Sequence, residues 1–201
     1  MSMRRKSYLS YGNLENRNLL AGNVTVVEDG QLYIRGDELS NQFAIVADES
    51  GQITVTGLQD TTINGSSEPY QVKESTNLDG ARSRNASFDG GLRIYTYGGD
   101  DRIDVQGIEF GDLSRVFTGA GNDFVRFLRS TSQDDFVTVT GDGEDTLNFV
   151  QARVHGDFNV TTSDGDDSIR IFNSRTWSDT HVFSGAGDDA CLLYTSDAAD
   201  E

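Results

Sequence analysis

A strict repeat of 22 residues in the second half of the chain constrains the fold more than any other feature. Five acidic turns close on an aspartate, and these aspartates are spaced 22 residues apart without an insertion: Asp101, Asp123, Asp145, Asp167 and Asp189. A glycine stands two positions before each of them, at 99, 121, 143, 165 and 187. Periods of roughly 20–50 residues are typical of solenoids, propellers and related arrays. The sequence therefore predicts an array of similar units.

The segments around each turn predict β-strands. After the turn, apolar and polar residues alternate, as in Ile103 and Val105 or Leu147 and Phe149, which is the pattern of a strand with one buried face. Before the turn, similar strands end in a hydroxyl column: Thr96, Thr118, Thr140, Thr162 and Ser184. Two clear strands per unit are too few for a propeller blade of roughly 40–45 residues.

An unbroken period with constant columns favours coils stacked in parallel over an antiparallel meander. We therefore expect an all-β, right-handed parallel β-solenoid (β-helix) with 22 residues per coil. The inward apolar columns would form one continuous core, and the remaining residues of each coil a third, irregular side. The recurring glycines fit a turn with positive φ and close backbone approach.

The regular repeats predict a division of the chain into four segments. Residues 1–22 form a leader that lacks the apolar core of a secretion signal, and no stretch is long and apolar enough for a membrane span. Residues 23–90 contain β-rich segments with a decaying period, and we expect them to form an amino-terminal cap with degenerate coils. Residues 91–190 carry the regular repeats, and residues 191–201 break them.

Two short segments resemble known sequences. Residues Leu14 to Leu20, Leu-Glu-Asn-Arg-Asn-Leu-Leu, resemble the LEPR-XLL motif of large planctomycete-type secreted repeat proteins, with Asn16 in place of the proline. Residues Cys191 to Glu201 resemble a translated sequencing adapter. The second resemblance implies a non-native scar, a truncated protein and a spurious Cys191, which would leave no thiol chemistry.

The charge of the chain limits its partners. The chain contains 33 acidic and 16 basic residues, which gives a formal charge of −17. Such a surface disfavours nucleic acid and anionic membranes and suits cations and a secreted setting.

The acidic turns are candidate calcium ligands. They resemble the Gly/Asp units of RTX-type calcium-binding β-rolls, most closely at 119–125, 141–147 and 185–189, although those units recur every nine residues. The resemblance implies Ca²⁺ held by turn oxygens. The candidate ligands are Asp101, Asp123, Asp145, Asp167, Asp189, Asn122, Glu144, Asp166 and Asp188. The alternative is that these residues only form turns, with carboxylates capping backbone N–H groups. Asp135, Asp157 and Asp179 form a sparser second column, which we expect to be solvated.

Catalytic motifs find little support. His155 and His181 lie 26 residues apart and out of phase, and no catalytic triad order, HExxH motif or phosphate loop occurs. We expect a non-enzymatic secreted or cell-surface structural or adhesion repeat protein, stabilised by calcium. Its expected partners are calcium ions, extracellular matrix, polysaccharide or other surface proteins, and not nucleic acid. The alternative is a fragment of a β-helix polysaccharide lyase or glycosidase whose catalytic part is missing.

Overall fold

The computed structural model describes residues 21–73, 75–76 and 86–195, and within them the secondary structure consists of strands and turns. The leader motif at 14–20 lies outside the described residues. No helix in these ranges is long and apolar enough to cross a membrane.

The amino-terminal cap begins with two antiparallel hairpins. Strand β1 (Asn23–Glu28) pairs with β2 (Leu32–Arg35), and β3 (Gln42–Ala47) pairs with β4 (Ile53–Gly57). Short strands β5 (Thr62–Ile63) and β6 (Tyr70–Gln71) extend these hairpins along β1 and β4. Strands β2 and β3 also pair in parallel with the first regular coil, so the cap provides the edge on which the coils stack.

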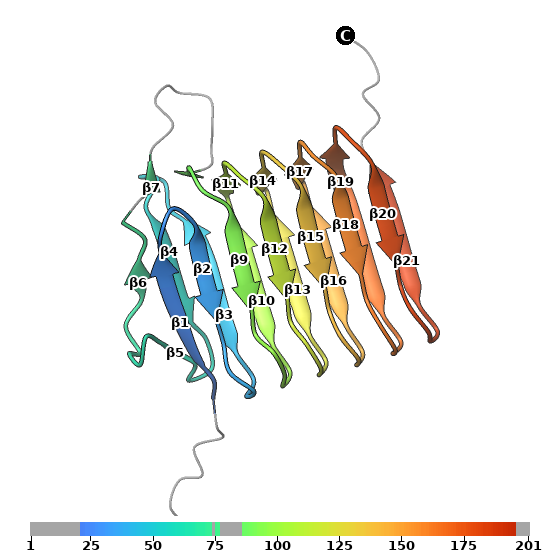
Figure 1. The fold of residues 1–201 in the computed structure, drawn as a ribbon, viewed down its shortest axis with the longest axis horizontal. Coiled ribbons are helices and arrows are strands. Elements are labelled where there is room, and N and C mark those ends of the chain that lie inside the picture. The colour runs from blue at the N-terminus through green and yellow to red at the C-terminus, as the bar shows by residue number, and fades with distance from the viewer. Residues whose placement is uncertain (1–20, 74, 77–85, 196–201) are drawn as a thin grey trace, which may run out of the picture.

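The regular coils have three sides, as Figure 1 shows in the rows of parallel arrows. The first side, after β2, contains β9 (Leu92–Tyr95), β12 (Ser114–Phe117), β15 (Phe136–Val139), β18 (Phe158–Thr161) and β20 (Thr180–Phe183). The second side, after β3, contains β10 (Arg102–Gln106), β13 (Phe124–Leu128), β16 (Thr146–Val150), β19 (Ser168–Thr176) and β21 (Ala190–Thr195).

The third side is short. It contains β8 (Ala86–Phe88), β11 (Ile108–Phe110), β14 (Thr131–Ser132), β17 (Arg153–Val154) and the end of β19, with β7 (Ser75–Thr76) antiparallel to β8. Along the regular coils, paired residues differ by 22 positions, as in Val125 opposite Leu147. The predicted parallel solenoid and its coil length are therefore confirmed. Its right-handed sense stays a prediction.

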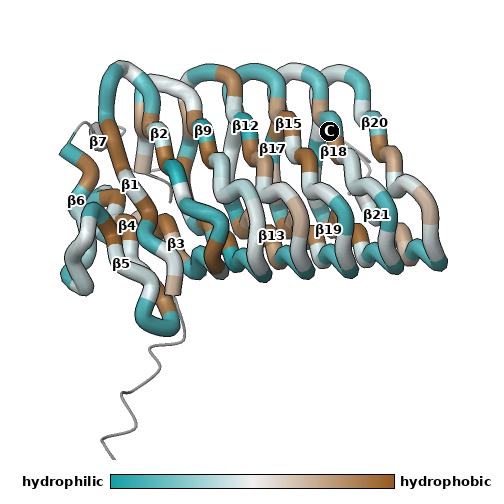
Figure 2. Tube along the Cα trace, turned by 60° about the horizontal axis from the view of Figure 1, so that its bottom comes forward, coloured by the Kyte–Doolittle hydropathy of each residue, from teal (hydrophilic) through white to brown (hydrophobic). Residues whose placement is uncertain are grey.

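The core consists of stacked apolar columns inside the coils. Ile103, Val125, Leu147 and Ile169 are at most 1% exposed, so the predicted inward column is confirmed. The rings of Phe136 and Phe158 meet Phe149 edge to face at 5.7 and 4.8 Å. Edge-to-face pairs add to the burial of apolar area, so these rings tie neighbouring coils together. Figure 2 shows that hydrophilic residues gather in the turns and hydrophobic ones in the strands.

The last strand pairs in the register of the repeat but is poorly buried. Strand β21 lies parallel to β19, with Cys191 opposite Ile169 and Leu193 opposite Ile171. Leu192, Leu193 and Tyr194 remain more than half exposed because no further coil covers them. The exposed side of β21 agrees with the expected poor packing, its pairing follows the register of the native repeat, and the origin of residues 191–201 stays a prediction.

Candidate functional site

The acidic turns connect the first side of each coil to the second, and glycine is required in them. Gly121 has φ of +135° and Gly143 has φ of +139°, a region that residues with a side chain rarely adopt. A Cβ on Gly121 would lie 2.2 Å from the carbonyl oxygen of Gly99, and one on Gly143 would lie 2.1 Å from that of Gly121. The expected positive φ and close approach are confirmed at both positions.

The aspartates that close the turns point into the coil and form a hydrogen-bonded ladder. Asp101, Asp123, Asp145 and Asp167 are 1–2% exposed. In each step, Oδ1 of one aspartate accepts the backbone N–H of the aspartate one coil earlier. The N to Oδ1 distances of the four hydrogen bonds, in order from the Asp101–Asp123 step to the Asp167–Asp189 step, are 2.9, 2.9, 2.9 and 3.1 Å. We call these five residues the inner column.

Asn41 of the cap begins the inner column. Its backbone N–H donates to Oδ1 of Asp101 at 2.7 Å, and its side-chain amide donates to the carbonyls of Asp37 and Leu39. Asn41 is fully buried. The repeat period did not indicate this residue, because Asn41 lies 60 positions before Asp101, off the 22-residue phase.

The second carboxylate oxygen of the inner column is weakly bonded at most. Oδ2 of Asp101, Asp123, Asp145 and Asp167 is buried and makes no hydrogen bond of standard geometry, and the same holds for the hydroxyls of Thr118 and Thr140. The hydroxyls of Thr96, Thr118 and Thr140 nevertheless lie close enough to the carboxyls of Asp101, Asp123 and Asp145 to donate to them. Burial raises the pKa of Asp101 and of Asp123 to about 7 and that of Asp145 to about 6, against the opposing effect of hydrogen bonds to the charged form. The interior of the turns therefore favours a proton or a cation on these oxygens.

The residues just before the inner column point to solvent. Asn122, Glu144, Asp166 and Asp188 are exposed. Their ladder runs in the opposite direction, because the Glu144 N–H donates to Oδ1 of Asn122 and the Asp188 N–H donates to Oδ1 of Asp166, at 2.8 and 2.9 Å. Asp157 and Asp179 repeat this pattern elsewhere, where the Asp157 N–H donates to Oδ1 of Asp135 at 2.7 Å.

The nine candidate ligands thus form two columns on opposite faces of the turn. Among the described residues, no three His, Cys, Asp or Glu side chains converge as a metal site would require. The capping alternative agrees with the geometry, with one difference. The carboxylates of both columns cap N–H groups of the adjacent coil, whereas a local turn cap would stay within its own coil.

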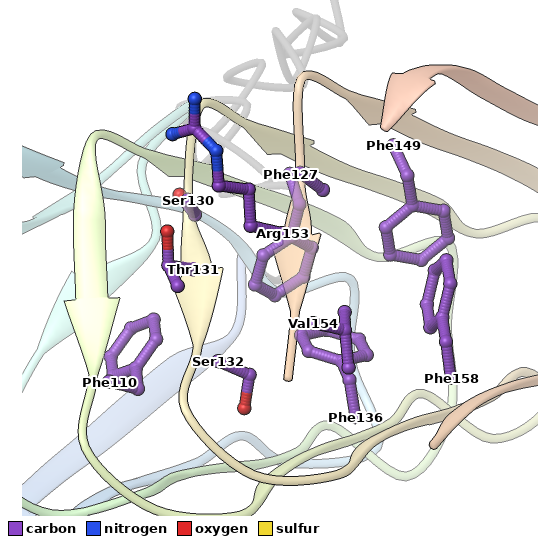
Figure 3. A pocket seen from close by; sticks show the side chains of 11 residues that line it. Phe110, Phe127, Ser130, Thr131, Ser132, Phe136, Phe149, Arg153, Val154 and Phe158 are labelled. Atoms are coloured by element: carbon purple, nitrogen blue, oxygen red, sulfur yellow. The ribbon is translucent and has the colours of Figure 1, made fainter. Parts of the chain in front are cut away.

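The coil interior leaves little room for a ligand. A cavity of about 10 Å³ lies among Phe110, Phe127, Phe136, Phe149 and Phe158 and the short strands of the third side (Figure 3). A water molecule needs about 10–15 Å³ of such space. This cavity is a packing gap at most one water in size, too small for an organic ligand.

The two histidines lie in unrelated surroundings. His155 stacks on Trp177 with ring centroids 4.2 Å apart, and His181 is exposed on β20. His181 shares its cross-strand row with Arg93, Arg115, Val137 and Asn159, as the sequence indicated.

Neither the protein-family models, nor the curated proteins, nor the solved structures contain a significant match to this chain.

Proposed function

We propose that this chain is a non-enzymatic structural and adhesion module of a secreted or cell-surface repeat protein. The observation that carries the proposal is the inner column, which continues without a break from Asn41 through Asp189. Hydrogen bonds along the axis join each coil to the next, in addition to the strand pairs. Such coupling suits a rod that holds its length and displays a surface.

The position of the acidic residues supports a structural role over a hydrolytic one. Glycoside hydrolysis needs two carboxyl groups on either side of the scissile bond. The buried carboxyls with raised pKa, which would suit a general acid, are 1–2% exposed and face the coil interior. A polymer on the outer surface would not reach them. The exposed column consists of carboxylates and Asn122 tied to backbone N–H groups.

An assay with polysaccharides tests this function. The full chain is incubated with acidic and neutral polysaccharides, and both retention on the immobilised polymer and release of reducing ends or unsaturated sugars are measured. We expect retention of the chain without new chain ends. Sustained release of sugar products by the purified chain, lost when its fold is lost, would replace the proposal by the lyase or glycosidase alternative.

We further propose that calcium stabilises the turns, and the buried Oδ2 atoms favour this. A buried carboxylate oxygen that accepts at most a weak hydrogen bond from a threonine requires an explanation, and one explanation is a bound ion. The inner column offers carboxylate and threonine hydroxyl oxygens, the donor type that Ca²⁺ prefers. The competing explanation is a proton on the carboxyls of Asp101, Asp123 and Asp145, consistent with their raised pKa.

Thermal unfolding separates the two explanations. Calcium that binds only the folded state raises the melting temperature by mass action, so Ca²⁺ should raise it more than NaCl of equal ionic strength. The double variant Asp145→Asn/Asp167→Asn retains an oxygen to accept the N–H of the preceding coil. It should lose the calcium effect. If Ca²⁺ and NaCl act alike on the parent, the turns hold no metal; a variant that is also more stable without ion indicates a proton on Asp145 in the parent.

A further inference from the structure

The outer face of the first side carries a cluster of arginines and aromatic rings at the junction of the cap and the first coils. The parallel register places Tyr33, Arg93 and Arg115 in one cross-strand row. The neighbouring row contains Arg35, Tyr95 and Phe117. These strands, β2, β9 and β12, lie side by side in Figure 1. We call these six residues the arginine–aromatic patch.

The rings of the patch are stacked along the solenoid. The Tyr95 and Phe117 rings are 5.2 Å apart at 5°, and the Tyr33 and Tyr95 rings are 5.8 Å apart at 38°. The Tyr95 and Phe117 rings are stacked and cover each other's faces, whereas Tyr33 is tilted against Tyr95. The ring edges and the tyrosine hydroxyls are left for a ligand. Arg35 lies over the ring of Tyr97, with Cζ 5.2 Å from its centroid. The aromatic side chains of the patch and Arg35 are thus held by contacts with neighbouring rings.

The arginines of the patch form no ion pair within the described residues, although Asp29 lines the hollow beside Arg93. Arg93 and Arg115 are direct cross-strand neighbours, and like charges in that position are destabilising. None of the three arginines forms a salt bridge with a carboxylate in the described ranges. Neither cross-strand row contains an acidic residue. Across the strands of the first side, one row leads from Val27 to His181 and the other from Thr25 to Phe183.

The second side of the coil provides the contrast. There Arg126 makes a two-pronged contact with Asp104 at 2.8 and 2.6 Å, and Arg102 lies 3.7 Å from the same carboxylate. Arg102 and Arg126 are therefore neutralised by Asp104, whereas Arg170 on the same side and the arginines of the patch form no salt bridge within the described residues. An unneutralised arginine pair in a chain of charge −17 indicates a surface for an anion.

A hollow in the surface lies beside the arginine pair. It is lined by Val27, Asp29, Gly30, Gln31, Tyr33 and Arg93. The Nε of Arg93 is buried and has no hydrogen-bond partner. A ligand group that entered the hollow would meet the Arg93 guanidinium, the Tyr33 ring and the Gln31 amide, but also the Asp29 carboxylate. Since Asp29 would repel an anion, a ligand carboxylate belongs on the arginine side of the hollow.

We propose that the arginine–aromatic patch binds a polysaccharide that carries carboxylate groups. Planar guanidinium groups bind carboxylates with two parallel hydrogen bonds, and phenol and amide groups suit sugar hydroxyls. Single-stranded nucleic acid also carries negative charge, but it requires open aromatic faces on which bases stack. Tyr95 and Phe117 cover each other's faces and Tyr33 is tilted against Tyr95, so the sugar polymer fits better than a row of stacked bases. This inference rests on the proposed adhesive function and names its ligand class.

Binding to polygalacturonate tests the proposal, with its methyl-esterified form as the matched neutral polymer. The full chain is titrated with oligomers of each by calorimetry, and with a single-stranded DNA oligonucleotide as a third ligand. We expect binding to the carboxylated oligomer alone, weakened by NaCl because exposed charges are screened. The variant Arg93→Gln/Arg115→Gln should lose roughly 10- to 100-fold in affinity, the effect of removing charged hydrogen bonds.

A second double variant controls for net charge. Arg170→Gln/Arg175→Gln removes the same charge from exposed side chains of β19, away from the patch. It should bind as the parent does. The patch variant should also melt no lower than the parent, since it removes a like-charge pair.

Three results would overturn the proposal: no binding to polygalacturonate, equal losses in the two double variants, or equal binding of DNA through the patch. None of them affects the proposed structural role, which depends on the inner column. Cleavage of the polymer would refute the non-enzymatic role while leaving the patch as the binding surface.

Discussion

At the scale of single residues, the glycines of the acidic turns are the least replaceable positions. Two factors act together in Gly143: a φ of +139° and the carbonyl oxygen of Gly121, which lies 2.1 Å from where a Cβ would stand. Backbone strain of this kind costs about 1–3 kcal/mol, and here the neighbouring backbone must also shift.

The change Gly143→Ala should therefore lower the free energy of unfolding by more than about 3 kcal/mol, the upper end of the strain term alone. Gly107→Ala is the matched control. Gly107 has φ of +70°, but a Cβ at this position would meet nothing within 4 Å, so the change should cost only about 1 kcal/mol. Urea unfolding of the two variants measures the difference. Equal losses would mean that the close approach between coils contributes nothing.

The buried carboxyls of the inner column should make the folded protein more stable at acidic than at neutral pH. Burial raises the pKa of Asp101 and Asp123 to about 7 and of Asp145 to about 6, above the ordinary 3.8. The folded state then binds protons more tightly than the unfolded state. The stability that these carboxyls contribute to the folded state is complete below pH 3.8 and is lost as the pH rises through about 6–7.

In the absence of divalent cations, the melting temperature should therefore rise as the pH falls from about 8 to about 5. Each of these carboxyls contributes at most about 1.4 kcal/mol per pH unit. Asp123→Asn should reduce the slope, because the amide stays neutral and its oxygen can still accept the Asp101 N–H. A melting temperature that falls over this range in the parent would show that the carboxyls are ionised in the folded protein.

At the scale of elements, the sequence predicted what repeats and missed what does not. The alternation in β10, β13, β16 and β19 identified their inward residues, because a strand with one buried face leaves a period of two. The third side left no such pattern. Its strands β14 and β17 contain two residues each, too few to show a period.

The sequence also did not predict the turn before the third side. Arg129, Gln151 and Asn173 all have positive φ, between 50° and 54°, one coil apart. Arginine and glutamine do not favour this conformation, so local preference gave no indication, and the stacking of coils imposes it. The inward orientation of the inner column was also missed. Aspartate usually marks a solvated turn, and only the register shows that its carboxylate caps the adjacent coil.

The arginine–aromatic patch was likewise only partly predictable from the sequence. The repeat phase placed Arg93 and Arg115 in one column, but their significance depends on the absence of an ion pair within the described residues. The sequence contains carboxylates near both arginines, at Asp89 and Asp112. Only the three-dimensional arrangement separates this face from the second side, where Asp104 neutralises Arg126.

At the scale of the whole molecule, the stacked coils should be interchangeable. Each regular coil contacts its two neighbours through the strand pairs and the inner column, with residues paired 22 positions apart on both sides. In such a solenoid, stability is close to a sum over units and their interfaces. Adding one whole coil should extend the rod without disturbing the rest.

Duplication of residues 124–145 tests this additivity, because the second copy begins after Asp145 where Thr146 normally follows and so preserves every column. The longer chain should unfold cooperatively with a larger free energy and a larger dependence on urea, since more surface is buried. Small-angle scattering should show a rod longer by about 4.7–4.9 Å, one strand spacing. Duplication of residues 135–145 alone adds half a coil, puts first-side residues over second-side residues and should prevent folding. If both duplications unfold the protein, the coils depend on contacts beyond their neighbours; if both are tolerated, the 22-residue register does not determine the fold.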